Sequence, residues 1–191
     1  VYDGMGIFSA ARVWWMFKYF GQDNVAVLDG GLPKWVSEGR EVTDEPPVIR
    51  DRHMVPNERP ELVRDVTQVA ASAKLGDHVI IDARPADRFK GEAPEPRAGL
   101  RSGHIPNSRN VPFTALLDSN GTMKNPGEMR LIFESAGVDL TKPAITTCGS
   151  GATAAILSLA LERIGVKHAL YDGSWAEWGM YSDLRVATGE A

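Results

Sequence analysis

Residues 144–153, Ala-Ile-Thr-Thr-Cys-Gly-Ser-Gly-Ala-Thr, join a short apolar run to a glycine-rich turn. The run over residues 144–147 predicts a buried strand, and the apolar pattern over residues 153–164, which ends before Gly165, predicts a helix. Cys148 therefore stands at a strand-to-helix turn. Strands that lead directly into helices are typical of parallel α/β sheets, whose ligands bind at the carboxyl ends of the strands.

The turn that follows Cys148 suits an anionic sulfur atom. Gly149 and Gly151 permit the positive φ values that let amide groups converge, and the next helix presents unpaired N–H groups at its N-terminus. Such a turn stabilises a thiolate, or the persulfide formed when a cysteine carries a second sulfur atom. We interpret Cys148 as a catalytic nucleophile. The alternative is a small buried core residue, the commoner fate of a lone cysteine.

A phosphatase is a second alternative for a cysteine in such a turn. It would need an arginine six residues after the cysteine to bind the phosphoryl oxygens, but Ala154 occupies that position. The missing arginine favours sulfur chemistry over phosphoryl transfer.

The beginning of the chain repeats the pattern of its end. Residues 2–6, Tyr-Asp-Gly-Met-Gly, align with residues 147–151, which places Asp3 opposite Cys148. Matching elements follow both segments: helices over residues 9–20 and 153–164, strands over residues 25–30 and 168–173, and then Trp35 and Trp178. We interpret the two segments as copies of one duplicated unit, of which only the second can perform thiol chemistry.

A domain boundary is expected between the two copies. Residues 43–60 hold four prolines among scattered charges, which is typical of an extended linker. Residues 1–42 would then be the C-terminal portion of a first, non-catalytic domain, and residues 61–191 a complete catalytic domain.

The expected fold class is α/β, with a parallel sheet covered by helices on both faces. Its further predicted elements are helices over residues 67–75 and 127–135, a strand over residues 78–82 and a long loop over residues 83–110.

The bulk composition excludes several classes of function. The 191 residues carry a formal net charge of −4, which provides no basic footprint for nucleic acid. No stretch approaches the roughly 20 apolar residues that cross a bilayer. One cysteine excludes an internal disulfide and fits a reducing compartment, so we expect a soluble, cytoplasmic protein. The four histidines and the cysteine lack the spacing of metal ligands, and we expect neither a metal nor another cofactor.

Further motifs carry a resemblance to a known family. They are Asp-Ala-Arg at residues 82–84, Pro-Glu-Pro-Arg at 94–97, Gly-His-Ile-Pro at 103–106, Asn-Val-Pro-Phe at 110–113 and Tyr-Asp-Gly-Ser-Trp-Ala-Glu-Trp at 171–178. Together with the Cys148 turn, they resemble the two-domain sulfurtransferases of the rhodanese superfamily. Gly-Ser-Gly after the cysteine is similar to the 3-mercaptopyruvate sulfurtransferases, whereas the thiosulfate enzymes typically have basic residues there. The resemblance covers the whole chain and implies that an upstream segment of the first domain is missing from it.

The resemblance also implies a reaction. Cys148 would take the sulfur of 3-mercaptopyruvate as a persulfide, release pyruvate and pass the sulfur to a thiol such as that of thioredoxin, or to cyanide. Thiosulfate as the donor remains an alternative, as does a non-catalytic sulfur-relay module that accepts sulfur from a partner protein.

Roles for individual residues follow from the same resemblance. Arg88 and Arg97 would hold the carboxylate and keto group of the substrate, to which the arginine fork is suited. Ser150 would assist Cys148 together with a histidine and an aspartate of the missing upstream segment. The loop residues Gly149, Gly151, Ala152 and Thr153 would complete the substrate site. We expect Arg84 to form a structural ion pair with Asp82, and His104 to shape its loop.

Overall fold

The fold follows the alternation of strand and helix patterns along the chain, and the computed structural model describes residues 1–51 and 53–190. The helices are α1 (Ala10–Tyr19), α2 (Gly31–Ser37), η1 (Pro60–Leu62), α3 (Val66–Leu75), α4 (Ala86–Lys90), η2 (Phe113–Leu116), α5 (Pro126–Ser135), α6 (Ala154–Arg163) and α7 (Ser174–Trp178). The strands are β1 (Val63–Arg64), β2 (Val79–Asp82), β3 (Arg109–Asn110), β4 (Ala144–Thr147) and β5 (His168–Tyr171). Arg52, in the expected linker, and Ala191, at the end of the expected catalytic domain, lie outside the described residues.

The five strands form one parallel sheet in the order β1-β5-β4-β2-β3. Strand β4 is central, and its last residue, Thr147, pairs with Asp82, the last residue of β2. Cys148 therefore leaves the middle of the sheet at its carboxyl edge. This sheet confirms the predicted α/β class.

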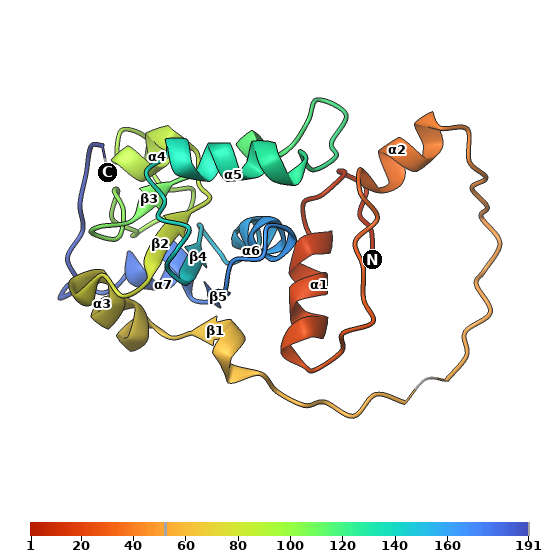
Figure 1. Ribbon diagram of the computed structural model, residues 1–191, viewed down its shortest axis with the longest axis horizontal. Coiled ribbons are helices and arrows are strands. Elements are labelled where there is room, and N and C mark those ends of the chain that lie inside the picture. The colour runs from red at the N-terminus through yellow and green to blue at the C-terminus, as the bar shows by residue number, and fades with distance from the viewer. Residues whose placement is uncertain (52, 191) are drawn as a thin grey trace.

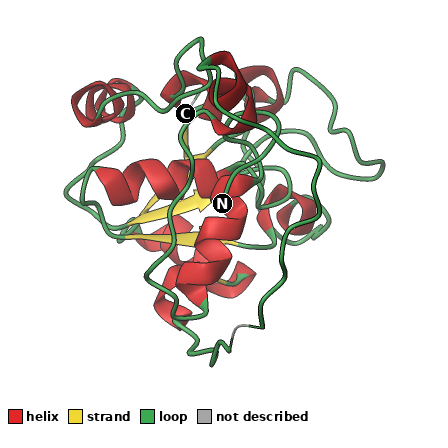
Figure 2. Ribbon diagram, turned by 90° about the vertical axis from the view of Figure 1, so that its right-hand side faces the viewer, coloured by secondary structure: helices red, strands yellow, loops and turns green. Residues whose placement is uncertain are grey.

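Each face of the sheet carries its own hydrophobic core, because side chains of a strand alternate between the faces. One core joins residues of α1, α5 and α6, including Trp14, Phe133 and Ile156, to Ile81 of β2. The other joins residues of α3 and α7 to Ile80 of β2. Figure 2 shows the strands enclosed between helices, as the expectation of a sheet covered on both faces requires.

The N-terminal segment packs on the second repeat through α1. Ala11, Trp14 and Trp15 of α1 are buried in the core that contains α6, and the two helices lie side by side in Figure 1. Residues 43–51 and 53–59 contain no helix or strand and run as a long arc around the outside of the fold (Figure 1). The domain boundary stays a prediction.

Most predicted elements are confirmed, but two expectations were wrong. The stretch over residues 25–30 is not a strand. It makes only two hydrogen bonds with Val1, in which the amino group of Val1 donates to the Ala26 carbonyl and the Leu28 N–H donates to the Val1 carbonyl. A single neighbouring residue is too little for a strand ladder.

The second wrong expectation was the uninterrupted loop over residues 83–110. It contains α4, a helix of five residues, and β3, a strand of two residues that pairs with Ile81 and Asp82 of β2. Neither is long enough to show a period in the sequence.

Within the described part of the chain, no helix is both long and apolar enough to span a membrane.

Candidate functional site

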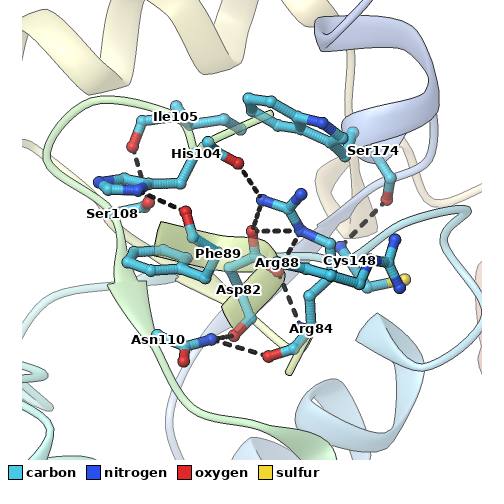
Figure 3. A network of polar contacts seen from close by, with 12 residues as sticks. Asp82, Arg84, Arg88, Phe89, His104, Ile105, Ser108, Asn110, Cys148 and Ser174 are labelled. Carbon is cyan, nitrogen blue, oxygen red and sulfur yellow. Dashed lines mark hydrogen bonds and ion pairs between the residues drawn. The ribbon is translucent and has the colours of Figure 1, made fainter. Parts of the chain in front are cut away.

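Cys148 is held at the carboxyl edge of the sheet by hydrogen bonds from three directions. Its side chain is 1% exposed, and its Sγ accepts the N–H of Gly151 at 3.1 Å. Its own N–H donates to the Ser174 hydroxyl at 3.3 Å (Figure 3). That hydroxyl donates to the Tyr171 carbonyl at 2.9 Å. Ser174 links Cys148 to the end of β5.

Helix α7 supports the same turn through its backbone. The N–H of Trp175 donates to the Cys148 carbonyl, and the N–H of Ala176 donates to the Gly149 carbonyl, both at 2.9 Å. Ser174 adopts a φ of 52°, which is strained for a residue other than glycine. Sequence reasoning assigned no role to Ser174, although the motif at residues 171–178 contained the signal.

In the first repeat, the loop that starts at Asp3 directs four backbone N–H groups to one point, an arrangement called a cradle below. The carboxylate of Asp3 occupies it. Asp3 Oδ1 accepts the N–H of Met5 at 2.8 Å, and Oδ2 accepts the N–H groups of Phe8, Ser9 and Ala10 at 2.8 to 2.9 Å. Burial, the largest single influence, raises the pKa of Asp3. The four amide donors together outweigh it and lower the pKa below its ordinary value.

The matching amides of the Cys148 loop belong to Ser150, Thr153, Ala154 and Ala155. The N–H of Ala155 donates to the Ala152 carbonyl at 3.3 Å, whereas the other three N–H groups have no acceptor among the described residues. Three of the four amides that the sequence offset matches to the Asp3 loop are therefore open in the second loop. This difference between the repeats agrees with the interpretation of Asp3 as chemically inert.

Asp3→Asn is expected to lower the free energy of unfolding at pH 7 by about 1 kcal/mol, because it removes the charge that four amides bind at a partly exposed site. Since the pKa of Asp3 is depressed, its contribution is present above the unfolded-state pKa and is lost as the pH falls through the folded-state value. Urea unfolding at pH 7 and at about pH 3 measures both effects. Equal losses at both pH values, or no loss at pH 7, would contradict this role.

A buried network of charges lies beside the nucleophile loop. Arg84 pairs with Asp82 at 2.7 Å and with Glu95 at 2.8 Å, and all three side chains are at most 2% exposed. Burial, the largest single influence, lowers the pKa of Arg84, but the two carboxylates outweigh it and raise the pKa above its ordinary value. Arg84 also lies over the ring of Trp175 at 4.4 Å. The predicted structural ion pair of Arg84 with Asp82 is confirmed.

Arg88 extends this network to the nucleophile loop. Its Nη2 pairs with Glu95 at 2.5 Å, and its Nε donates to the same carboxylate at 3.2 Å. A Cβ added to Gly149 would lie 3.1 Å from Arg88 Nη2, so the guanidinium rests against the residue that follows Cys148. Figure 3 shows the Arg88 side chain close to Cys148. Glu95, which positions Arg88, was missed by sequence reasoning.

The predicted site residues gather around one pocket of about 370 Å³. Its lining includes Arg88 and Arg97 together with five residues of the Cys148 loop: Cys148, Gly149, Ser150, Ala152 and Thr153. Gly151 is not part of the lining and acts through its N–H on Cys148 Sγ.

The two arginines of the pocket differ in their surroundings. Arg97 is exposed and forms no ion pair within the described part of the chain, whereas Arg88 is paired with Glu95.

The described residues contain no group of three or more His, Cys, Asp or Glu that could hold a metal ion.

His104 lies away from the nucleophile in a structural setting. It is 2% exposed, stacks on Phe89 with ring centroids 3.8 Å apart, and its Nδ1 lies 2.8 Å from the Phe89 carbonyl. Because a carbonyl can only accept, Nδ1 carries the proton. Burial, the largest influence, lowers the pKa of His104. These contacts agree with the expectation that His104 shapes its loop.

Known proteins share this fold and much of this sequence. The family model described as the rhodanese-like domain matches residues 65–181. The chain is 42% identical over 210 residues to thiosulfate/3-mercaptopyruvate sulfurtransferase 2 of Arabidopsis thaliana, with 97% of this chain and 61% of that protein covered. It is 43% identical over 187 residues to 3-mercaptopyruvate sulfurtransferase of Escherichia coli K12, with 97% and 66% covered.

A solved structure agrees with these relatives. The crystal structure of SseA from Escherichia coli, described as a 3-mercaptopyruvate sulfotransferase with the rhodanese fold, superposes with a TM-score of 0.81 at 41% identity. The superposition covers 92% of this chain and 65% of that one. The chain thus spans about two thirds or less of the length of these relatives.

Proposed function

This chain belongs to the rhodanese-like family, and from that premise we propose that it is a sulfurtransferase that moves the sulfur of 3-mercaptopyruvate through a persulfide on Cys148. Relatives of that name are about 40% identical over nearly the whole chain. A family member with a cysteine in an open pocket has the reacting group that direct catalysis requires.

One observation supports this function above the others: the open cradle of the Cys148 loop beside the filled cradle of Asp3. An aspartate side chain has the same bond sequence as a cysteine persulfide, with Oδ in the place of the outer sulfur. In the first loop, Oδ2 of Asp3 accepts three amide N–H groups. The outer sulfur of a Cys148 persulfide would meet the matching amides of Thr153 and Ala154, whose N–H groups have no acceptor among the described residues.

The reaction balances with the groups of this site. The Cys148 thiolate attacks the sulfur of 3-mercaptopyruvate, so that an S–S bond forms and the C–S bond breaks. The electron pair of the broken bond leaves as pyruvate enolate, which takes a proton to become pyruvate. An acceptor thiolate then attacks the outer sulfur, breaks the S–S bond and restores the Cys148 thiolate.

The two arginines of the pocket are proposed to hold the substrate. Arg88 keeps Nη1 free of Glu95, and Arg97 is exposed at the pocket. Both can donate to the carboxylate and keto oxygen of a 2-oxo acid and stabilise the departing enolate. Ser150, also exposed in the lining, is proposed to assist Cys148.

The remaining assignments extend this proposal. A small thiol or a thioredoxin-like protein would accept the sulfur, and cyanide would serve as an alternative acceptor. An upstream segment would complete the site around Ser150. The expected compartment is the cytoplasm.

Incubation with 3-mercaptopyruvate alone, followed by intact-mass measurement, tests the function. A gain of about one sulfur atom, removed by a thiol reagent, is the expected result, because the first half-reaction needs no acceptor. An unchanged mass contradicts direct catalysis and favours a relay module that needs a partner protein.

The choice of donor is tested by comparing kcat/KM for 3-mercaptopyruvate and thiosulfate on one preparation. We expect 3-mercaptopyruvate to be preferred by about tenfold or more, because the turn after Cys148 carries no cation for an inorganic dianion. A preference for thiosulfate would make thiosulfate the donor, and the proposed Cys148 persulfide intermediate would still hold.

A further inference from the structure

Arg12 belongs to α1 in the first repeat, yet its guanidinium lies against the nucleophile loop of the second. Its Nη2 pairs with Asp172 Oδ1 at 2.6 Å. A Cβ added to Gly151 would lie 3.2 Å from Arg12 Nη1 and 3.0 Å from the Asp172 carbonyl. The ring of Trp15 covers the guanidinium at 4.7 Å. Arg12, Asp172 and Gly151 therefore form one packed unit.

The Nη1 atom of Arg12 has no evident structural use. It is shielded from solvent and has no hydrogen-bond partner within residues 1–51 and 53–190. A buried N–H without an acceptor destabilises a fold, and one on a charged group costs more than most. Its persistence beside the nucleophile loop calls for a role other than the ion pair with Asp172.

Gly151 connects this cation to the nucleophile. It has a φ of 82°, and its N–H donates to Cys148 Sγ at 3.1 Å. The guanidinium is not part of the pocket lining, so it stands behind the loop while the substrate would enter from the front. Asp172 Oδ1 also lies 3.3 Å from the Cβ position of Gly151, so the guanidinium is one half of an ion pair there. Its Nη1 edge, which has no acceptor among the described residues, is the part that can stabilise an anionic sulfur across the Gly151 peptide without touching the substrate.

We propose that Arg12 is a positioning residue for Cys148, which fixes the Gly151 amide toward the sulfur and supplies a fixed positive charge behind the nucleophile loop. The proposal rests on Cys148 as the reacting group of the proposed function. It predicts an effect on the reactivity of the sulfur rather than on the binding of the donor, because Arg88 and Arg97 line the pocket and Arg12 does not.

The experiment compares Arg12→Lys, which keeps the charge, with Arg12→Gln, which keeps a hydrogen-bond donor for Asp172 and loses the charge. Arg59→Gln is the matched control, since Arg59 also pairs with an aspartate, Asp23, at 2.6 Å. Two rates are measured for each variant at pH 7: alkylation of the single cysteine by iodoacetamide, and sulfur gain from 3-mercaptopyruvate over a range of donor concentrations.

Arg12→Gln is expected to slow alkylation about tenfold and to lower the maximum rate of sulfur gain by a similar factor. The donor concentration at half-maximum is expected to change less than about twofold, and Arg12→Lys to stay within about threefold of the unmodified protein. Thermal unfolding of each variant confirms that the folded protein is compared, and Arg59→Gln is expected to match the unmodified protein in both rates.

Three outcomes would overturn the proposal. In the first, Arg12→Gln is alkylated as fast as the unmodified protein; in the second, Arg12→Lys is as slow as Arg12→Gln. In the third, Arg12→Gln changes only the donor concentration that gives the half-maximum rate of sulfur gain. Alkylation needs no sulfur donor. If the unmodified protein gains no sulfur, the proposed function fails, and the alkylation rates still decide the role of Arg12.

Discussion

Cys148→Ser is expected to abolish sulfur transfer, with turnover at least about 10⁴-fold lower than in the unmodified protein. A serine hydroxyl is not ionised near neutral pH and cannot store sulfur as a persulfide. Because no other cysteine is present, no neighbouring thiol can replace it. Thiocyanate formation from 3-mercaptopyruvate and cyanide measures turnover, and intact mass measures storage.

The same variant separates the catalytic interpretation from that of a buried core cysteine. A side chain that is 1% exposed agrees with either, but only the catalytic one predicts loss of activity in a protein that still folds. The matched control is Thr147→Val, since the hydroxyl of Thr147 is buried without a hydrogen-bond partner among the described residues. It is expected to keep its activity. Turnover retained in Cys148→Ser would remove the nucleophile from the mechanism.

Arg84→Met is expected to lower the free energy of unfolding by about 4 kcal/mol, because it leaves two buried carboxylates without their shared cation. Asp82 and Glu95 are at most 2% exposed, so water cannot replace the guanidinium. Urea unfolding measures the loss. Activity is expected to fall as well, since Glu95 positions Arg88.

Two companion variants sharpen this prediction. Arg59→Met removes an ion pair with an exposed carboxylate and is expected to leave the free energy of unfolding nearly unchanged. The triple variant Arg84→Met with Asp82→Asn and Glu95→Gln is expected to recover part of the stability, because no buried charge then lacks a partner. A loss in Arg84→Met no larger than in Arg59→Met would show that the network is not the stabilising element inferred here.

The fold could be predicted from the sequence where a local pattern is long and the element has pairing or packing partners along its length. Helix α6 and strand β4 lie where the apolar periods place them. The stretch over residues 25–30 has an equally good strand pattern, but its backbone hydrogen bonds to a neighbouring described segment are the two with Val1. A strand depends on its partners, and the local sequence does not report them.

The candidate site could be predicted only in part, for a similar reason. The turn at Cys148 is visible in the sequence because its glycines and the adjoining helix are consecutive. Glu95, Ser174 and Arg12 reach the site through contacts distant in the sequence, such as the ion pair between Arg12 and Asp172. No spacing rule connects an arginine on the first helix of the chain with a loop near its end.

The filled and open cradles have a consequence for the catalytic cycle. Asp3 gives its loop a permanent anion, whereas the Cys148 loop would hold an outer sulfur only in half of each cycle. The persulfide stays on Cys148 when the chain unfolds, but only the folded loop can hydrogen-bond its outer sulfur, so the persulfide form is expected to melt at a higher temperature than the free thiol form. The fold then favours the loaded state, and the acceptor must overcome that preference. Stronger hydrogen bonds from this cradle would thus stabilise the persulfide but slow the transfer of its outer sulfur to the acceptor.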